Sequence, residues 1–389
     1  MKVFILAGEQ SGDKLGGALM AGLSSLTSVE FQGVGGTMMQ AQGLKSLFDM
    51  HDLSVMGLLE VLPKASKLLR HVKQTVKAAQ AFTPDVLITI DSPDFSLRVS
   101  RKLKKINPNL KVVHYVAPSV WAWRPERAVK MAKSVDHVLA LLPFEPSYME
   151  AAGMTCDFVG HPVVSEPVPS EAEAAALADE LGLDRSRPIL CVLPGSRKGE
   201  VIRMGPVFRR SIAPAVQKHA GIQILVPAAR GVVNQIKEMV EDWALRSFIM
   251  DPTGFSAEDS EHRKRAAFRL ADLALATSGT VALELAAAEC PMVVAYKANY
   301  LTTQIVKNMA QINTANLVNI VTSTQIIPEF LFENCTVDAI GSTVSTLLSD
   351  TGSHARQRAA FSQTIEALGR YGEDPGLRAA KSIMAFLAR

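Results

Sequence analysis

The chain alternates between short apolar runs and longer amphipathic stretches over most of its length. Short runs rich in Val, Ile and Leu are typical of strands buried on both faces of a parallel sheet, and the intervening stretches have the length of crossover helices. In the first half this pattern predicts strands at 2–7, 86–90, 111–117, 136–142 and 156–159, with a further short strand before Gly33. The second half repeats the rhythm, with strands expected at 188–194, 222–227, 273–276 and 292–296 and a short one near Phe248. We therefore predict an α/β fold in which one βα unit is approximately doubled.

A change in composition marks a boundary between the halves. The segment 160–169 is rich in proline, which is typical of an interdomain linker. At 389 residues the chain also exceeds what one hydrophobic core usually holds. We expect domains at 1–165 and 166–350, followed by a helical tail at 351–389 that is interrupted near 372–375.

One segment, 86–98, places an acid at the end of a buried strand. Asp91 follows the apolar run Val86–Ile90, at the sheet edge where open α/β proteins bind ligands. Pro93 stops the strand and favours a stiff turn. Asp94 then stands where the N-cap of a helix over 95–104 is expected. Asp91 has two interpretations, a general base or a residue that only orients the loop.

Glycine-rich turns follow the first two strands. Gly8, Glu9, Ser11 and Gly12 lie between the strand 2–7 and a helix, where backbone N–H groups can face an anion. A second turn, at 33–36, lacks the third glycine of a dinucleotide-binding motif. Both turns also have a purely conformational interpretation, as tight βα connections.

The stretch 58–77 is amphipathic and its charges are all basic after Glu60. Its apolar residues recur at helical spacing, and we expect the helix to start near Pro63. Such a helix suits an anionic membrane surface, but a crossover helix with a solvated basic face would have the same pattern.

The loop 118–127 brings two tryptophans and two arginines to another strand end. Trp121 and Trp123 could stack on a sugar or lie in the core, and Arg124 suits a phosphate. His161, near the linker, could face a ligand or be structural.

Two loops of small residues follow strands in the second half and open helices. One contains Gly195, Ser196 and Arg197, and the other contains Ser278, Gly279 and Thr280. Together they could hold a diphosphate. Glu284 lies one turn further on and could accept hydrogen bonds from ribose hydroxyls, since no Lys or Arg near it in sequence would explain it as a local helix ion pair.

The bulk composition excludes several classes of protein. The net charge of +3 is too small to indicate a nucleic-acid partner, and a hydrophobic content of 48% argues against wholesale disorder. The four cysteines are far apart and form no zinc motif, which favours a reducing compartment. We find no signal peptide and no apolar run that would span a bilayer.

Several motifs together resemble the lipid-A-disaccharide synthase family of glycosyltransferases. They are AGEQSGD (7–13), IDSPDF (90–95), HYVAPSVWAWR (114–124), LPFEP (142–146), FVGHP (158–162), LPGSR (193–197), ATSGTVALE (276–284) and CPMVVAYK (290–297). They occur in the family's order over nearly the whole chain. The sequence departs from the family at 316–319, where Leu-Pro-Asn is more usual, and Asn319 is carried over by position.

The resemblance implies two facing Rossmann-like domains of the GT-B type, with the active site in the cleft and a C-terminal helix crossing back. It implies that 2,3-diacylglucosamine is transferred from its UDP derivative to the 6-hydroxyl of 2,3-diacylglucosamine 1-phosphate, with inversion. The products would be a β-1,6-linked disaccharide 1-phosphate and UDP. The first domain would then serve the acceptor and the membrane surface, and the second would bind the UDP-sugar.

The resemblance also implies roles for individual residues. Asp91 would be the base and Arg197 the diphosphate clamp. The donor would contact Gly195, Ser196, Ser278, Gly279, Thr280, Glu284 and Asn319. The acceptor would lie near Gly8, Glu9, Ser11, Gly12, Asp94, Trp123 and Arg124. The acylated substrates strengthen the membrane interpretation of 58–77, with Leu58, Leu59, Val61, Leu62, Leu68 and Leu69 inserting.

The expected partners follow from this assignment. We expect no metal, because Asp-Ser-Pro-Asp lacks the D-x-D spacing of metal-dependent transferases, and no cofactor beyond the UDP-sugar substrate. We expect a cytoplasmic homodimer held peripherally at the inner membrane. Three alternatives remain: a UDP-N-acetylglucosamine transferase acting on another lipid-linked acceptor, a UDP-N-acetylglucosamine 2-epimerase, and a non-catalytic membrane-surface nucleotide sensor.

Overall fold

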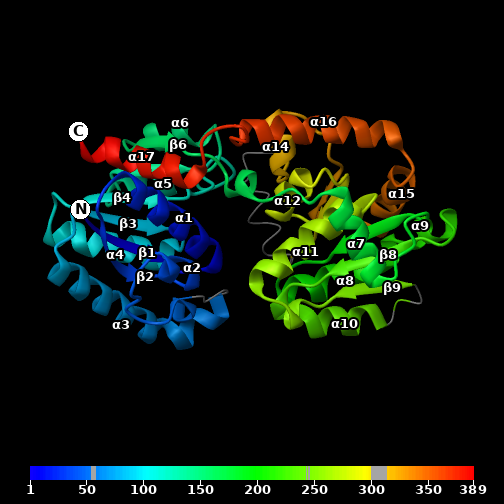
Figure 1. Cartoon of the computed structure of the whole chain (residues 1–389), viewed down its shortest axis with the longest axis horizontal. Helices are drawn as coiled ribbons and strands as arrows, with labels where there is room; N and C mark the ends of the chain where they lie inside the picture. Colours follow the sequence, from blue (N-terminus) through cyan, green and yellow to red (C-terminus); the bar gives the residue numbers. More distant parts are fainter. Residues whose placement is uncertain (54–57, 242, 244–245, 299–312) are drawn as a thin grey trace. The chain divides into compact units, whose positions relative to one another are not determined.

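The computed structural model describes residues 1–53, 58–241, 243, 246–298 and 313–389, and for 58–65 it describes the backbone helix alone. The chain forms two compact units (Figure 1). The first comprises Met1–Ser165 and Leu368–Arg389, and the second comprises Glu166–Ala367.

The first unit is built on a parallel sheet of six strands in the order β2-β1-β3-β4-β5-β6. The strands are β1 (Lys2–Ala7), β2 (Glu30–Val34), β3 (Val86–Ile90), β4 (Lys111–Tyr115), β5 (His137–Ala140) and β6 (Thr155–Phe158). The helices are α1 (Gln10–Leu26), α2 (Thr37–Ala41), α3 (Leu58–Phe82), α4 (Pro93–Ile106), α5 (Glu126–Ala132), α6 (Glu145–Glu150) and α17 (Pro375–Leu387), and short 3-10 turns lie at Met50–Leu53 and Pro162–Ser165.

The strand order reverses between β1 and β3. The chain steps from β1 outward to β2 and then returns to the other side of β1 to form β3. Because such crossovers are right-handed, this reversal places α1 and α3 on opposite faces of the sheet. The carboxyl ends of β1 and β3 therefore form the position at which open α/β sheets bind ligands.

Asp13 joins the two glycine-rich turns of the first unit. Its buried carboxylate accepts hydrogen bonds from the backbone N–H groups of Gly36, Met38 and Met39, at 2.7, 2.9 and 3.1 Å. These donors belong to the start of α2, where a negative charge is favourable. A Cβ atom at Gly36 would lie 2.6 Å from the Asp13 carboxylate, so this glycine is required by packing.

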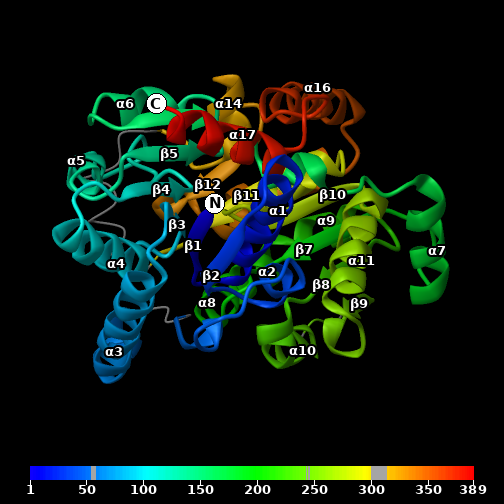
Figure 2. The ribbon, with the colours of Figure 1, turned by 60° about the vertical axis from the view of Figure 1, so that its left-hand side comes forward.

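The last helix of the chain, α17, packs on α1, and Figure 2 shows it in red beside the blue α1. The crossing is close because a Cβ atom at Gly22 would lie 2.7 Å from the carbonyl oxygen of Gly376. Further along α17, Ser382 hydrogen-bonds the buried His137 of β5. The expected returning segment 351–389 was too long, because α16 (Thr351–Ala367) belongs to the second unit.

The second unit has its own parallel six-stranded sheet, in the order β12-β11-β10-β7-β8-β9. The strands are β7 (Ile189–Leu193), β8 (Gln223–Pro227), β9 (Ser247–Met250), β10 (Leu273–Thr277), β11 (Met292–Tyr296) and β12 (Glu329–Leu331). The helices are α7 (Glu171–Leu181), α8 (Lys198–Ser211), α9 (Ala213–Lys218), α10 (Val233–Glu241), α11 (Ala257–Leu270), α12 (Val281–Ala287), α14 (Leu317–Thr322), α15 (Val337–Leu347) and α16, and short 3-10 turns lie at Arg230–Val232, Pro252–Gly254 and Phe332–Asn334. Its order reverses between β7 and β10, so each unit has a switch point.

Most predicted strands match the structure within two residues at each end, and four features differ. The helix expected after Gly12 begins at Gln10, so that Ser11 and Gly12 lie within it. The helix expected from Pro63 starts at Leu58. The helix expected over 95–104 runs from Pro93 to Ile106. The short strand β12 was not predicted; its residues are only half-buried, and Glu329 interrupts the apolar pattern.

Candidate active site

At the first switch point, the turn after β1 meets the turn after β3. The strands are in register as far as Ala7 and Ile90. The next residues, Gly8 and Asp91, therefore follow adjacent strand ends. A Cβ atom at Gly8 would lie 2.4 Å from Oγ of Ser92, so only glycine allows this approach.

Asp91 and Ser92 both have left-handed backbone conformations, with φ of 47° and 46°. Two consecutive non-glycine residues in this region are unusual, and such strain concentrates at functional sites. The backbone N–H of Asp91 donates to the carbonyl oxygen of Tyr115 at 3.0 Å, which anchors the strained turn to β4. The site aspartate is thus held in a fixed position at the switch point.

Burial raises the pKa of Asp91 above its usual range, and the effect outweighs two opposing ones. A hydrogen bond from the backbone of Ser92 and the positive charge of Arg127 both lower the pKa. A carboxylate with a raised pKa is a stronger base than an exposed aspartate. Arg127 was not among the predicted site residues.

The expected N-cap at Asp94 is wrong, because α4 begins two residues after the strained Asp91. Ser92 occupies the N-cap position and Pro93 is the first helical residue. Asp94 lies exposed in the first turn, where its charge favours the helix without capping it.

The turn between β1 and α1 leads into a helix whose first residue is Gln10. Glu9 is the N-cap residue, with extended backbone and no side-chain capping bond. Ser11 is exposed in the first turn, and Gly12 is buried, where an added Cβ atom would lie 3.5 Å from the side chain of Ile90. These residues, together with Gly8, lie beside the strained turn of Asp91.

The tryptophan loop between β4 and α5 is tied to the β5–α6 turn. The indole N–H of Trp121 donates to Glu145 at 3.3 Å, and its ring meets Phe144 edge to face at 5.3 Å. Trp123 is half-buried and stacks under the guanidinium of Arg124 at 4.4 Å. Trp121 therefore anchors the loop, while Trp123 and Arg124 contact each other and are half-buried.

Glu145 is a buried carboxylate that sequence reasoning did not select. It accepts from the backbone N–H groups of Leu141 and Leu142, at 3.1 and 3.0 Å, as well as from Trp121. Burial raises the pKa of Glu145 to about 7, although these hydrogen bonds lower it. Its motif, LPFEP, was noted, but a buried acid at the start of a helix resembles an ordinary first-turn acid in sequence.

At the second switch point, the loop after β7 lies beside the loop after β10, since Leu193 pairs with Ala276. Glu200 occupies the cradle of the first loop. Its carboxylate accepts from the backbone N–H groups of Ser196 and Arg197, at 3.1 and 3.3 Å, and from Nη1 of Arg197 at 3.4 Å. The Arg197 side chain itself is 61% exposed.

Gly195 and Gly279 differ in whether the surrounding atoms leave room for a side chain. Gly195 has a φ of 125°, and a Cβ atom there would lie 2.5 Å from Cβ of Glu200. By contrast, a Cβ atom at Gly279 would meet no atom of the described residues within 4 Å. Packing therefore explains the first glycine, whereas no described residue packs against the second.

The neighbours of Gly279 in the loop after β10 are accessible. Ser278 is half-buried, Thr280 is exposed, and Glu284 follows one turn into α12. Glu284 has a partner that is distant in sequence, because Nζ of Lys264 on α11 lies 2.7 Å from its carboxylate. An ion pair therefore does involve Glu284, although not one within its own helix.

Two residues considered for the site have structural roles. Asn319 is buried, and its amide exchanges two hydrogen bonds of 3.0 Å with the backbone of Ile327. It thereby closes the 319–327 loop rather than facing a ligand. Burial lowers the pKa of His161 to about 4, and its Nδ1 accepts from the backbone N–H of Val163 at 3.1 Å. This histidine is thus neutral at physiological pH.

The predicted membrane surface lies only partly within the described side chains. Those of Leu58, Leu59, Val61 and Leu62 lie outside them. Leu68 packs against the core of the first unit, whereas Leu69 is 54% exposed. Exposed basic side chains on α3 and the adjoining α4 extend this surface: Arg70, Lys73, Lys77, Arg98, Arg101, Lys102 and Lys105.

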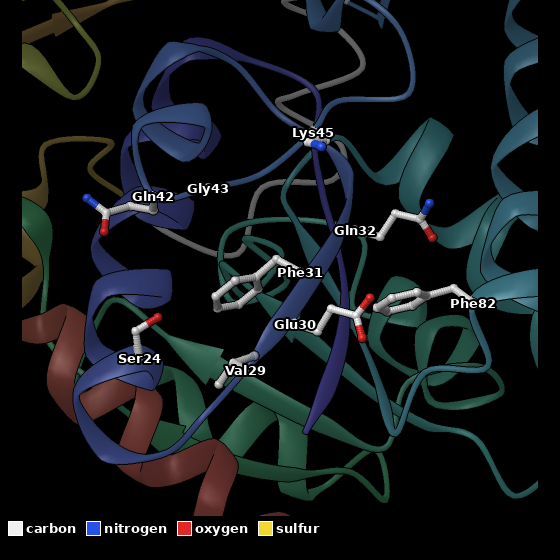
Figure 3. A pocket seen from close by; sticks show the side chains of 9 residues that line it. All are labelled: Ser24, Val29, Glu30, Phe31, Gln32, Gln42, Gly43, Lys45 and Phe82. Carbon is white, nitrogen blue, oxygen red and sulfur yellow. The ribbon is translucent and has the colours of Figure 1, made fainter.

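A cavity of about 470 Å³ opens at the edge strand β2 (Figure 3). Phe31 lies on one side of the strand, and Glu30 and Gln32 lie on the other, towards Phe82. Because Glu30 pairs with Lys2 at the amino ends of β2 and β1, this cavity is at the opposite end of the sheet from Asp91.

Comparisons with known proteins decide the family. The family model for lipid-A-disaccharide synthetase matches residues 3–381. The chain belongs to this family. A lipid-A-disaccharide synthase of Ruegeria pomeroyi is 54% identical over 385 residues, covering 99% of this chain and 95% of that protein. Another, from Rhodospirillum centenum, is 40% identical and covers 100% of this chain and 95% of its own length.

Solved structures with little sequence identity share the fold. A UDP-GlcNAc 2-epimerase from Neisseria meningitidis, bound to UDP-GlcNAc, has a TM-score of 0.66 at 11% identity and covers both chains fully. A glycosyltransferase from Rickettsia africae has a TM-score of 0.59 at 12% identity and covers 100% of this chain and 98% of its own. The predicted architecture of two Rossmann-like domains of the GT-B type is confirmed.

The described part of the chain lacks two features. None of its helices is long and apolar enough to cross a bilayer. Within the same residues, no three His, Cys, Asp or Glu side chains are grouped so that they could hold a metal ion.

Proposed function

We propose that this chain transfers 2,3-diacylglucosamine from UDP-2,3-diacylglucosamine to the 6-hydroxyl of 2,3-diacylglucosamine 1-phosphate. The products are the β-1,6-linked disaccharide 1-phosphate and UDP. Membership of the lipid-A-disaccharide synthase family over residues 3–381 is the observation that carries this proposal. Relatives that are 54% and 40% identical bear the same name.

The first unit activates the acceptor. Transfer with inversion needs one displacement, in which a base removes the proton of the attacking hydroxyl. Asp91 suits this role, because its turn is held at the switch point and burial raises its pKa. The proton passes from the 6-hydroxyl to the Asp91 carboxylate as the oxygen attacks the anomeric carbon and UDP departs.

The acceptor side is formed by the other residues near this switch point. The start of α1, with Gly8, Glu9, Ser11 and Gly12, offers a positive helix end to the acceptor phosphate. Trp123 provides a face for the sugar ring, and Arg124 provides a second positive charge. Asp94 orients a sugar hydroxyl from its exposed position.

The second unit holds the donor. The exposed guanidinium of Arg197 balances the charge that develops on the departing diphosphate. Ser196, Ser278 and Thr280 provide hydroxyl groups, and Gly279, against which no described residue packs, lets the ligand approach the backbone. Glu284 accepts hydrogen bonds from the ribose. This assignment uses no metal ion or cofactor, since the sugar nucleotide is itself the substrate.

The acylated substrates stay in a membrane, so the enzyme must reach them there. The basic faces of α3 and α4 suit an anionic lipid surface, and Leu69 is placed to insert between head groups. We propose peripheral association with the inner membrane from the cytoplasmic side, by a homodimer.

The reaction is tested in detergent micelles that contain both acylated substrates. Formation of the tetraacyl disaccharide and UDP is expected, and UDP-N-acetylglucosamine should not replace the acylated donor. Conversion of that unacylated sugar nucleotide to its 2-epimer without an acceptor would indicate an epimerase instead. UDP binding without turnover of any donor would contradict a transferase.

A further inference from the structure

The carboxylate of Glu284 is held by a lysine from another helix. Nζ of Lys264 on α11 lies 2.7 Å from Oε2 of Glu284 on α12 and 2.6 Å from Oε2 of Glu261 on its own helix. Lys264 is 27% exposed and Glu284 is 31% exposed, whereas Glu261 is 53% exposed. The lysine thus links the second switch point to an outer acid.

Lys264 differs from its arginine neighbours in the carboxylate that it holds. Arg263 pairs with Glu180 of α7, and Arg269 pairs both with Glu171 of α7 and with Glu289, just beyond the carboxyl end of α12. Lys264 instead pairs with Glu284, within α12. Desolvation lowers the pKa of Lys264, but the carboxylates of Glu284 and Glu261 together raise it by more. The net effect is a raised pKa, so the lysine stays charged.

One oxygen of Glu284 is therefore committed to Lys264. The charged hydrogen bond fixes the rotamer of the carboxylate and leaves the second oxygen, Oε1, to accept from a ligand. A carboxylate with one oxygen fixed and one available suits a ribose, whose neighbouring hydroxyls need an acceptor in a defined place.

We infer that Lys264 is a positioning residue for ribose recognition: it orients Glu284 towards the ribose hydroxyls of the UDP-sugar. This inference rests on the proposed function, which assigns the ribose to Glu284. It adds a residue that contacts no substrate and acts only through its ion pair.

The test compares binding of UDP with binding of 2′,3′-dideoxy-UDP, which lacks the ribose hydroxyls. The wild-type protein should bind UDP with roughly tenfold or higher affinity than the dideoxy analogue, since a hydrogen bond to a charged group contributes at least this much to affinity. Lys264→Met should lose most of this preference, and Lys264→Arg should restore it. Glu261→Gln is the matched control, because it removes the other partner of Lys264 and should keep the preference.

The possible outcomes separate the inference from the proposed function. If Lys264→Met weakens UDP and dideoxy-UDP equally, or leaves both unchanged, the positioning role is wrong. If Glu284→Ala keeps the preference, the ribose is recognised elsewhere, and both assignments fail. If the wild-type protein does not bind UDP, the proposed function fails. Thermal unfolding of each variant distinguishes a lost fold from a lost contact.

Discussion

The carboxylate of Glu200 accepts the backbone hydrogen bond of Ser196 at 3.1 Å, in the loop where the donor diphosphate is proposed to bind. The same carboxylate also engages the backbone and guanidinium of Arg197. The Glu200 carboxylate therefore occupies the N–H donors that a phosphate group would use, and its negative charge would repel that phosphate group.

Glu200→Gln should bind UDP more tightly than wild type. Glutamine keeps an acceptor of similar length but loses the negative charge, which at a partly exposed site corresponds to about 1 kcal/mol, or roughly fivefold in affinity. Calorimetric titration with UDP measures the effect, and uridine, which lacks the diphosphate, should bind equally to both proteins. Weaker UDP binding by the variant would show that Glu200 supports the loop instead of competing with the ligand.

Asp91→Asn should raise the thermal stability of the protein near neutral pH. Burial raises the pKa of Asp91 in the folded state, so the folded protein binds this proton more tightly than the unfolded chain does. Protonated Asp91 therefore contributes to the free energy of unfolding. This contribution is fully present below the pKa of Asp91 in the unfolded chain, near 3.8, and is lost as the pH rises through its pKa in the folded protein. Asparagine does not ionise, so the variant does not lose this stability near neutral pH. Asparagine also tolerates the left-handed backbone of residue 91.

Asp91→Ala provides the comparison for this measurement. Alanine also removes the charge but costs about 1–2 kcal/mol in the left-handed region, so it should melt below Asp91→Asn. Scanning calorimetry at pH 7.5 orders the three proteins. An Asp91→Asn protein that melts below wild type would mean that the ionised carboxylate is stabilised by its surroundings.

Arg127→Gln should shift the acid limb of the pH–rate profile upward. The charge of Arg127 lowers the pKa of Asp91, so its removal lets that pKa rise further. The base must be ionised to act. As the pH is lowered, kcat/KM of the variant should therefore begin to fall at a higher pH than kcat/KM of the wild type. Lys130→Gln, an exposed change on the same helix, is the control and should leave the profile in place. An unshifted profile for Arg127→Gln would mean that the acid limb does not report the ionisation of Asp91.

Leu69→Ser should weaken binding to anionic vesicles without loss of folding. The side chain is 54% exposed beside the basic residues of α3, whereas Leu68 packs against the core and would report on stability as well. Val168→Ser, a change in the second unit at a side chain that is 47% exposed, is the control. Sedimentation with vesicles measures binding, and unchanged pelleting of Leu69→Ser would contradict the role of α3.

The strands could be predicted closely because parallel strands buried on both faces form continuous apolar runs. Val86–Ile90 is an example in which every residue is buried. The strand expected over 111–117 ends early, at Tyr115, because Val116 has a φ of 82°. A β-branched residue gives no sign of such a backbone in the sequence.

The places of the candidate site residues in the fold were predictable where these residues follow strand ends, and not where they depend on distant partners. Asp91 and Arg197 follow recognisable strands. The N-cap at Ser92 was missed because nothing in the sequence indicates two consecutive left-handed residues. The partners Arg127 and Lys264 act across loops or between helices, so no spacing rule selects them.

The most direct test of the central claim, that Asp91 is the base of a glycosyl transfer, is the rate of disaccharide formation by wild type and Asp91→Asn in substrate-containing micelles. Asparagine preserves the strained turn and removes the proton acceptor. The account predicts that kcat falls by at least about a hundredfold while the Kd for UDP stays unchanged. Disaccharide formation by Asp91→Asn at the wild-type rate would contradict it.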